Sequence, residues 1–200
     1  SGANTLGLAK LGPGTLTLTG TNTYSGGTTV TGGLVNFSSL ASLGIGSVTL
    51  NGGGLQWATG TTADLSSRLT TLGANGGTFD TNGNNVTFAS SFGASGSGAL
   101  TKAGSGTLTL NAANTYTGGT TVNGGWLEVS NSSALGTGAV SVTGGALAGN
   151  GTLSQAVTLS SSGRIEPGTL ILGGTSAASS AGTLTLSSLN VSSGELVFQL

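Results

Sequence analysis

The stretch LTKAGSGTLTLNAANTYTGGTTVNGG, residues 100–125, occurs in two similar copies in this chain of 200 residues. The earlier copy, at residues 8–33, is LAKLGPGTLTLTGTNTYSGGTTVTGG. A shift of 92 residues aligns residues 8–55 with residues 100–147 without a gap, and 26 of these 48 pairs are identical. Because self-similarity at a fixed spacing is the signature of repeat architectures, each copy is interpreted as a structural unit.

A shorter pattern inside the copies predicts the secondary structure. The string G-T-L-x-L occurs at residues 14–18, 106–110, 168–172 and 182–186. Its two Leu residues are two positions apart, so they lie on one face of a strand, with Thr or Ile on the other. Similar alternation occurs at residues 48–50, 86–88, 140–142, 157–159, 189–191 and 196–200. The chain is therefore predicted to form many short strands.

The residues between these strands favour a coil over a set of hairpins. Gly makes up 40 of the 200 residues, and Gly and Asn together form tight turns because they tolerate positive φ. Aromatic residues make up only 4% of the chain, which is few for the thick core of a sandwich or barrel. The predicted fold is all-β, a single β-solenoid domain over residues 1–200 with about eight or nine coils.

The spacing of the copies divides the predicted solenoid. If 92 residues are a whole number of turns, four coils of about 23 residues is the natural division. Repeat unit A then covers about residues 8–99, unit B about residues 100–165, and tail coils about residues 166–200. Residues 61–73 carry Leu65, Leu69 and Leu72 at helical spacing, but we interpret them as an irregular insertion or a variant coil, with a short helix as the alternative.

The low charge limits the classes of partner. The formal net charge is −1, and the few cations are not clustered, so no nucleic-acid partner is expected. No apolar run reaches the length of a membrane span, so this segment is not expected to insert into a membrane. There is no Cys, which is compatible with export. The charged residues are Lys10, Arg68, Lys102, Arg164, Asp64, Asp80, Glu128, Glu166 and Glu195.

The repeated polar residues are predicted to be structural. In the Asn-x-Tyr pairs, Asn is expected to cap a corner through its own backbone and Tyr to bury its ring with its hydroxyl at the edge; a carbohydrate contact is the alternative. The repeated lysines are interpreted as solvated residues that protect strands from aggregation, and a binding pair is the alternative. The predicted coil-building residues are Leu8, Lys10, Gly14, Leu16, Leu18, Asn22, Tyr24, Gly26, Val30, Leu100, Lys102, Gly106, Leu108, Leu110, Asn114, Tyr116, Gly118 and Val122.

No catalytic, cofactor-binding or metal-binding residues are predicted. The chain has five carboxylates and no His, which is a poor supply of acid and base groups. Asp64 with Arg68, and Arg164 with Glu166, are spaced like isolated ion pairs, and Asp80 is placed in a turn. Without Cys or His there are no ligands for a zinc site.

The repeated motif also resembles a known family. The pattern L-x-K-x-G-x-G-T-L-x-L at residues 100–110, followed by N-x-Y-x-G-G-T-x-V-x-G-G at residues 114–125, is similar to the passenger-associated transport repeat of autotransporter proteins of type V secretion. Residues 8–33 match it again, although Trp126 replaces Leu34 just after the motif. The tail, GRIEPGTLILGG and GTLTLSSLNVSSGELVFQL, resembles the stretch that commonly follows such repeats.

This resemblance implies a right-handed parallel β-helix that is exported through both membranes. It also implies an extracellular or bacterial cell-surface location and a β-barrel translocator outside this chain. The expected function is a β-helical stalk, with adhesion or self-association as its activity toward an unidentified host or cell-surface ligand. One alternative is a fibre-forming protein that assembles through solenoid ends or low-charge flanks. Another is a β-helical glycan-processing enzyme that uses Asp64, Asp80 or Glu166.

Overall fold

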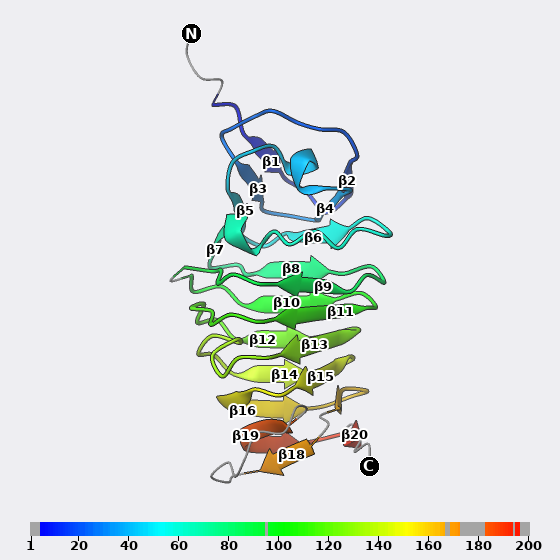
Figure 1. The fold of residues 1–200 in the computed structure, drawn as a ribbon, viewed down its shortest axis with the longest axis vertical. Coiled ribbons are helices and arrows are strands. Elements are labelled where there is room, and N and C mark those ends of the chain that lie inside the picture. Colours follow the sequence, from blue (N-terminus) through cyan, green and yellow to red (C-terminus); the bar gives the residue numbers. More distant parts are fainter. Residues whose placement is uncertain (1–4, 95, 167–168, 173–182, 194, 197–200) are drawn as a thin grey trace.

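Hydrogen bonds between successive turns of the chain, rather than within hairpins, define the fold. The computed structural model describes residues 5–94, 96–166, 169–172, 183–193 and 195–196. Within these residues every strand pair is parallel, and about eight turns stack along the long axis of the molecule (Figure 1). The predicted β-solenoid is confirmed.

The described strands form three parallel sheets, A, B and C. Sheet A contains β1 (Leu8–Lys10), β3 (Thr28–Val30), β5 (Val48–Leu50) and β7 (Leu69–Leu72). Sheet B contains β2 (Thr15–Leu18), β4 (Leu34–Phe37), β6 (Gly54–Trp57), β8 (Gly77–Asp80), β10 (Leu100–Ala103), β12 (Thr120–Val122), β14 (Val140–Val142), β16 (Thr152–Leu159), β19 (Thr183–Val191) and β18 (Thr169–Leu172). Sheet C contains β9 (Val86–Phe88), β11 (Thr107–Leu110), β13 (Trp126–Val129), β15 (Ala146–Gly149), β17 (Arg164–Ile165) and β20 (Glu195–Leu196).

Several strand predictions are met, and the variant coil is explained. All four G-T-L-x-L strings contain a strand, as do the alternating segments at residues 48–50, 86–88, 140–142, 157–159 and 189–191. Of the predicted strand at residues 196–200, only Leu196 is among the described residues. Residues 61–73 are a variant coil that holds the 3-10 turn η2 (Ser66–Arg68) and then β7. A second 3-10 turn, η1, covers Leu40–Leu43.

Most coils are shorter than the predicted 23 residues. In sheet A, Leu8 pairs with Thr28 and Thr28 with Val48, and in sheet B, Leu100 pairs with Thr120 and Thr120 with Val140. Each of these steps advances the chain by 20 residues. Longer steps lie in the middle, where Gly54 pairs with Thr78 and Gly77 with Leu100.

These longer steps rotate the second repeat by one face of the solenoid. Strand β10 is the counterpart of β1 in the other copy, yet β1 lies in sheet A and β10 in sheet B. Likewise β2 lies in sheet B, whereas its counterpart β11 lies in sheet C. The coil that begins at β7 gives one strand to each sheet, through β7, β8 and β9. The 92-residue spacing is therefore four coils plus one face, and the division into a whole number of coils is wrong.

An aromatic ladder fills the core where this rotation occurs. The rings of Phe37 and Trp57 are 5.1 Å apart, and those of Phe79 and Phe88 are 5.5 Å apart. Phe92 continues the ladder to the ring of Tyr116, at 5.8 Å. All six rings are buried, and they account for most of the chain's few aromatic residues. Elsewhere the core is thin and aliphatic.

No helix among the described residues is long and apolar enough to cross a membrane.

We expect the two copies of the Leu ladder to differ in their contribution to stability. Leu108 is completely buried between neighbouring coils, whereas its counterpart Leu16 lies in β2, the last strand of sheet B, and is only half-buried. Leu108→Ala should lower the free energy of unfolding by about 2–5 kcal/mol, and Leu16→Ala by less. Urea unfolding followed by circular dichroism measures both. A loss below about 1 kcal/mol for Leu108→Ala would show that this ladder is not the core.

Candidate functional site

The repeated lysines point into the solenoid and bind backbone carbonyls. Lys102 is fully buried, and its Nζ donates to the carbonyl oxygens of Ala103 at 2.7 Å, Gly104 at 2.9 Å and Gly124 at 3.1 Å. Gly124 belongs to the next coil, so the ammonium group joins two coils. Lys10 makes the equivalent bonds to Leu11, Gly12 and Gly32. The prediction that these lysines are solvated is wrong, because strand alternation turns them inward toward the carbonyls of the Gly-rich corner.

We call the Lys102 ammonium group and its three carbonyl partners the Lys102 clamp. Among the described residues, no carboxylate is hydrogen-bonded to this ammonium group. Burial lowers the pKa of Lys102 to about 8, and the negative charge of Asp80 offsets part of this effect. A Cβ atom at position 125 would lie 2.9 Å from the Lys102 Nζ, so glycine at that position leaves room for the ammonium group. This is a structural clamp rather than a binding pair, since its donors are directed to the backbone of its own chain.

The Asn-x-Tyr corner of the second copy joins three coils. Asn114 accepts from the Phe92 backbone N–H through Oδ1 at 2.9 Å and donates from Nδ2 to the Ala134 carbonyl at 2.6 Å. Tyr116 is fully buried, and its hydroxyl is 2.8 Å from Thr120 Oγ1. Burial raises the pKa of Tyr116. The prediction of a tyrosine hydroxyl at the edge is wrong here, and this ring is not accessible to a carbohydrate.

The first copy repeats this corner with fewer neighbours. Asn22 Nδ2 donates to the Ser42 carbonyl at 2.7 Å, and the Tyr24 hydroxyl is 2.8 Å from Thr28 Oγ1. Both Asn22 and Tyr24 are half-buried. In both copies Asn bonds to the neighbouring coil, and Asn114 Nδ2 also donates to the Ala112 carbonyl of its own corner at 3.4 Å, so the predicted local cap is accompanied by a contact between coils.

The other motif residues also serve stacking. Leu100, Leu110, Val30 and Val122 are buried, while Leu8 and Leu18 at the first coil are half-buried. A Cβ at Gly26 would overlap the backbone of Thr5 and Leu6, and one at Gly118 that of Gly98. Both glycines therefore allow the close approach of two coils. Gly106 has a φ of 84°, which favours glycine, whereas its counterpart Gly14 has open space around it.

Asp64, Asp80, Glu128 and Glu166 lie on different coils, and each of these four carboxylates accepts structural hydrogen bonds. Asp64, which precedes η2, accepts from the backbone N–H groups of Ser66 at 2.8 Å and Ala89 at 3.0 Å. Asp80 is the last residue of β8 rather than part of the turn as predicted, and it accepts from the Asn82 N–H in the turn that follows. Gln56 Nε2 donates to the other oxygen of Asp80 at 2.7 Å. No group of three potential metal ligands occurs in the described part of the chain.

Arg68 binds carbonyl groups instead of Asp64. Its guanidinium donates to the carbonyl oxygens of Leu40 at 2.8 Å, Leu43 at 2.9 Å and Gly46 at 2.6 Å, which closes the end of η1. Burial lowers the pKa of Arg68, partly offset by Tyr24. The predicted Asp64–Arg68 ion pair is therefore wrong. Over the residues that the structure describes, Arg164–Glu166 is the only ion pair, at 2.6 Å, as predicted.

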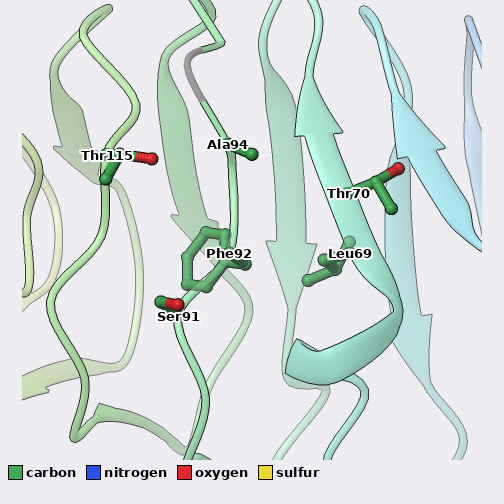
Figure 2. Close-up of a pocket in the computed structure, with 6 residues that line it drawn as sticks. All are labelled: Leu69, Thr70, Ser91, Phe92, Ala94 and Thr115. Carbon is green, nitrogen blue, oxygen red and sulfur yellow. The ribbon is translucent and has the colours of Figure 1, made fainter.

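A shallow cavity of 160 Å³ lies where sheet A ends (Figure 2). Phe92, which is buried, and Leu69 supply its apolar lining, and Ala94 and three hydroxyl residues complete it. The lining residues are Leu69, Thr70, Ser91, Phe92, Ala94 and Thr115. None of these six residues is an Asp, Glu, His, Lys, Cys or Tyr.

Sequence patterns missed two other features. The hydrogen bonds of Arg68 to backbone carbonyls could not be predicted from the repeat, because Arg68 lies outside the two aligned copies. Trp126 had a signal, since it replaces Leu34 in an otherwise similar coil. It is 39% exposed on sheet C, and its Nε1 donates to Glu166 Oε2 at 3.0 Å.

Comparisons with known proteins agree with the repeat structure. A family model described as the passenger-associated transport repeat matches residues 8–36 and 100–129, which begin at β1 and β10. The chain is also similar to the adhesin BmaC autotransporter of Brucella suis biovar 1 (strain 1330), with 43% identity over 129 residues. That match covers 58% of this chain and 4% of the adhesin, so the chain spans only a small part of that protein's length. No solved structure matches the chain.

The buried clamp predicts how stability depends on pH. The pKa of Lys102 is about 8 in the folded chain, below the ordinary value of 10.5, so between these values the unfolded chain binds more protons. The free energy of unfolding should therefore rise as the pH increases from about 8 to about 10, by about 1–3 kcal/mol. Lys102→Met removes the titrating group, so the free energy of unfolding of this variant should not show the increase that Lys102 causes. Urea unfolding of both proteins across this range measures it, and identical pH profiles would contradict the prediction.

Proposed function

We propose that the chain is part of an autotransporter passenger with passenger-associated transport repeats and acts as a β-helical stalk with adhesion as its activity. The observation that carries the proposal is the uninterrupted parallel stacking from β2 to β16 along sheet B. At about 4.8 Å for each coil, about eight coils give a rod of roughly 40 Å. Such a rod serves to hold a surface away from the cell.

The composition suits export followed by folding outside the cell. Without Cys, the chain forms no disulfide that would hinder its passage in an unfolded state. Each coil pairs with the one before it, so folding of one coil provides the edge for the next. We propose that this stepwise stacking occurs at the bacterial surface, after passage through a translocator that lies outside this segment.

Adhesion is preferred to self-association as the activity. The similar protein from Brucella suis is named an adhesin, and the same role is proposed for this chain. Fibre formation through solenoid ends or low-charge flanks is the competing function. A non-enzymatic role is supported by the carboxylates, since Asp64, Asp80 and Glu166 accept structural hydrogen bonds on separate coils.

The strand register provides variants that test the stalk. Deleting residues 100–119 removes one coil, because Leu100 and Thr120 are register partners, and the remaining coils can still stack. Deleting residues 100–109 removes half a coil and breaks the register. In the full-length protein on its own bacterium, an epitope tag in the exposed turn at Thr59 and Gly60 reports surface display by antibody labelling of intact cells.

We expect wild-type protein and the one-coil deletion to be displayed and to support adhesion to a surface, and the half-coil deletion to fail in both. Labelling only after permeabilisation would contradict the surface location. Unchanged adhesion after removal of residues 8–166 would contradict the adhesive role. Sedimentation of the purified chain tests the competing function, because assembly into long multimers would favour a fibre and a monomeric rod would exclude it.

A further inference from the structure

Trp126 differs from the other aromatic residues that the structure describes. Six rings are buried in the ladder through the core, and Tyr24 is half-buried and bonded to Thr28. Trp126 alone in this part of the chain presents a large aromatic side chain to solvent, with 39% exposed. It occupies the position of Leu34 in the first copy, so this exposed ring belongs to the second copy.

The Trp126 side chain lies along the outer surface of sheet C. In the register of this sheet, Trp126 pairs with Ala146, and Ala146 with Arg164. Ala146 is fully buried although it shares the outward side of the sheet with Trp126, and it does not belong to the core cluster. Trp126 Nε1 reaches Glu166, which follows β17 two coils further along the sheet, so the indole extends past the coil of Ala146 while 39% of the residue stays exposed.

Glu166 fixes the orientation of this ring. Its Oε2 accepts from Trp126 Nε1 at 3.0 Å, and its Oε1 is paired with Arg164 Nε at 2.6 Å. The hydrogen bond from Trp126, together with Arg164, lowers the pKa of Glu166 despite its partial burial. The carboxylate is thus ionised at neutral pH and neutralises Arg164. The result is a flat ring held in place beside a half-exposed guanidinium whose charge is paired.

The side chains on the strands beside the Trp126 ring are mostly polar, and most of them are short. Thr107 pairs with Trp126 on the preceding coil, and Thr109 donates to Glu128 at 3.0 Å beside it. Ala148 pairs with Glu128 on the following coil. These neighbours do not form an apolar patch around Trp126, whereas a typical protein interface has an apolar core. A polar ligand with one apolar face fits this surface better than an apolar protein surface.

We propose that the exposed part of the Trp126 ring, with Arg164 held nearby through Glu166, binds a neutral oligosaccharide of β-linked glucose. Such a pyranose presents axial C–H groups on a flat face that stacks on an indole ring. Its equatorial hydroxyls reach outward to the guanidinium, the threonine hydroxyls and Glu128. This proposal rests on the adhesive function above and deepens it by naming the class of ligand.

The test uses the intrinsic fluorescence of the purified chain, with cellotetraose as the probe and maltotetraose, its α-linked isomer, for comparison. Of the two Trp residues, Trp57 is fully buried, so a change in exposed emission reports on Trp126. We expect a saturable change with cellotetraose and protection of the exposed emission from acrylamide quenching. Trp126→Leu introduces the residue of the first copy. It should keep the circular dichroism spectrum and weaken binding, measured by calorimetry, by about tenfold or more.

Trp126→Phe should retain part of the affinity, since it keeps an aromatic ring. Equal binding by wild type and Trp126→Leu, or no saturable response to cellotetraose at millimolar concentration, would overturn the proposal. A cell-adhesion assay distinguishes failure of the proposed saccharide site from failure of the proposed adhesive function. Adhesion that is equal in wild type and Trp126→Leu overturns the saccharide platform and leaves the adhesive function in place. Saccharide binding by the purified chain without cell adhesion supports the platform and overturns the adhesive function.

Discussion

Parallel backbone pairing between one coil and the next is the constraint on which the rest of this structure depends. Each short strand finds its hydrogen-bond partners only if the chain returns to the same face after one turn, which takes 20 residues in the regular coils. The three sheets leave corners in which neighbouring backbones approach closely. Glycine is required at positions such as Gly118, where a Cβ would overlap the coil beside it. The glycine-rich composition is thus a consequence of stacking.

The corners also determine how charge enters the solenoid. A corner turns several carbonyl groups inward, and buried carbonyls need donors. Lys102 and Lys10 supply several N–H groups to such carbonyls within their own coil and in a neighbour, and Arg68 supplies several to the neighbouring coil. Desolvation of an ammonium group is costly, but hydrogen bonds to a charged donor are stronger than neutral ones. Three of the four cations in the chain therefore hold the backbone rather than a ligand.

Because of the rotation by one face, equivalent residues of the two copies lie on different sheets of the solenoid. Leu34 and Trp126 are equivalent in sequence, but Leu34 lies on sheet B and Trp126 on sheet C. Leu34 is half-buried and pairs with Gly54, whereas Trp126 pairs with Ala146 and reaches Glu166. A repeated motif thus presents different side chains in different directions. This lets a regular stalk carry a local surface feature without a change in its core.

The sequence by itself determined the solenoid, the strands and the inward Leu residues, because alternation with a period of two and turns rich in glycine are local properties. It also determined that the chain has few acid and base groups, with five carboxylates and no His. It did not determine the orientation of Lys102, which depends on where the corner carbonyls of the next coil lie. The rotation of the second copy was also decided by tertiary structure, since the 92-residue spacing does not reveal how many residues each coil uses. The Trp126 surface likewise exists only because Ala146, Arg164 and Glu166, distant in sequence, are brought beside it by coils that stack in register.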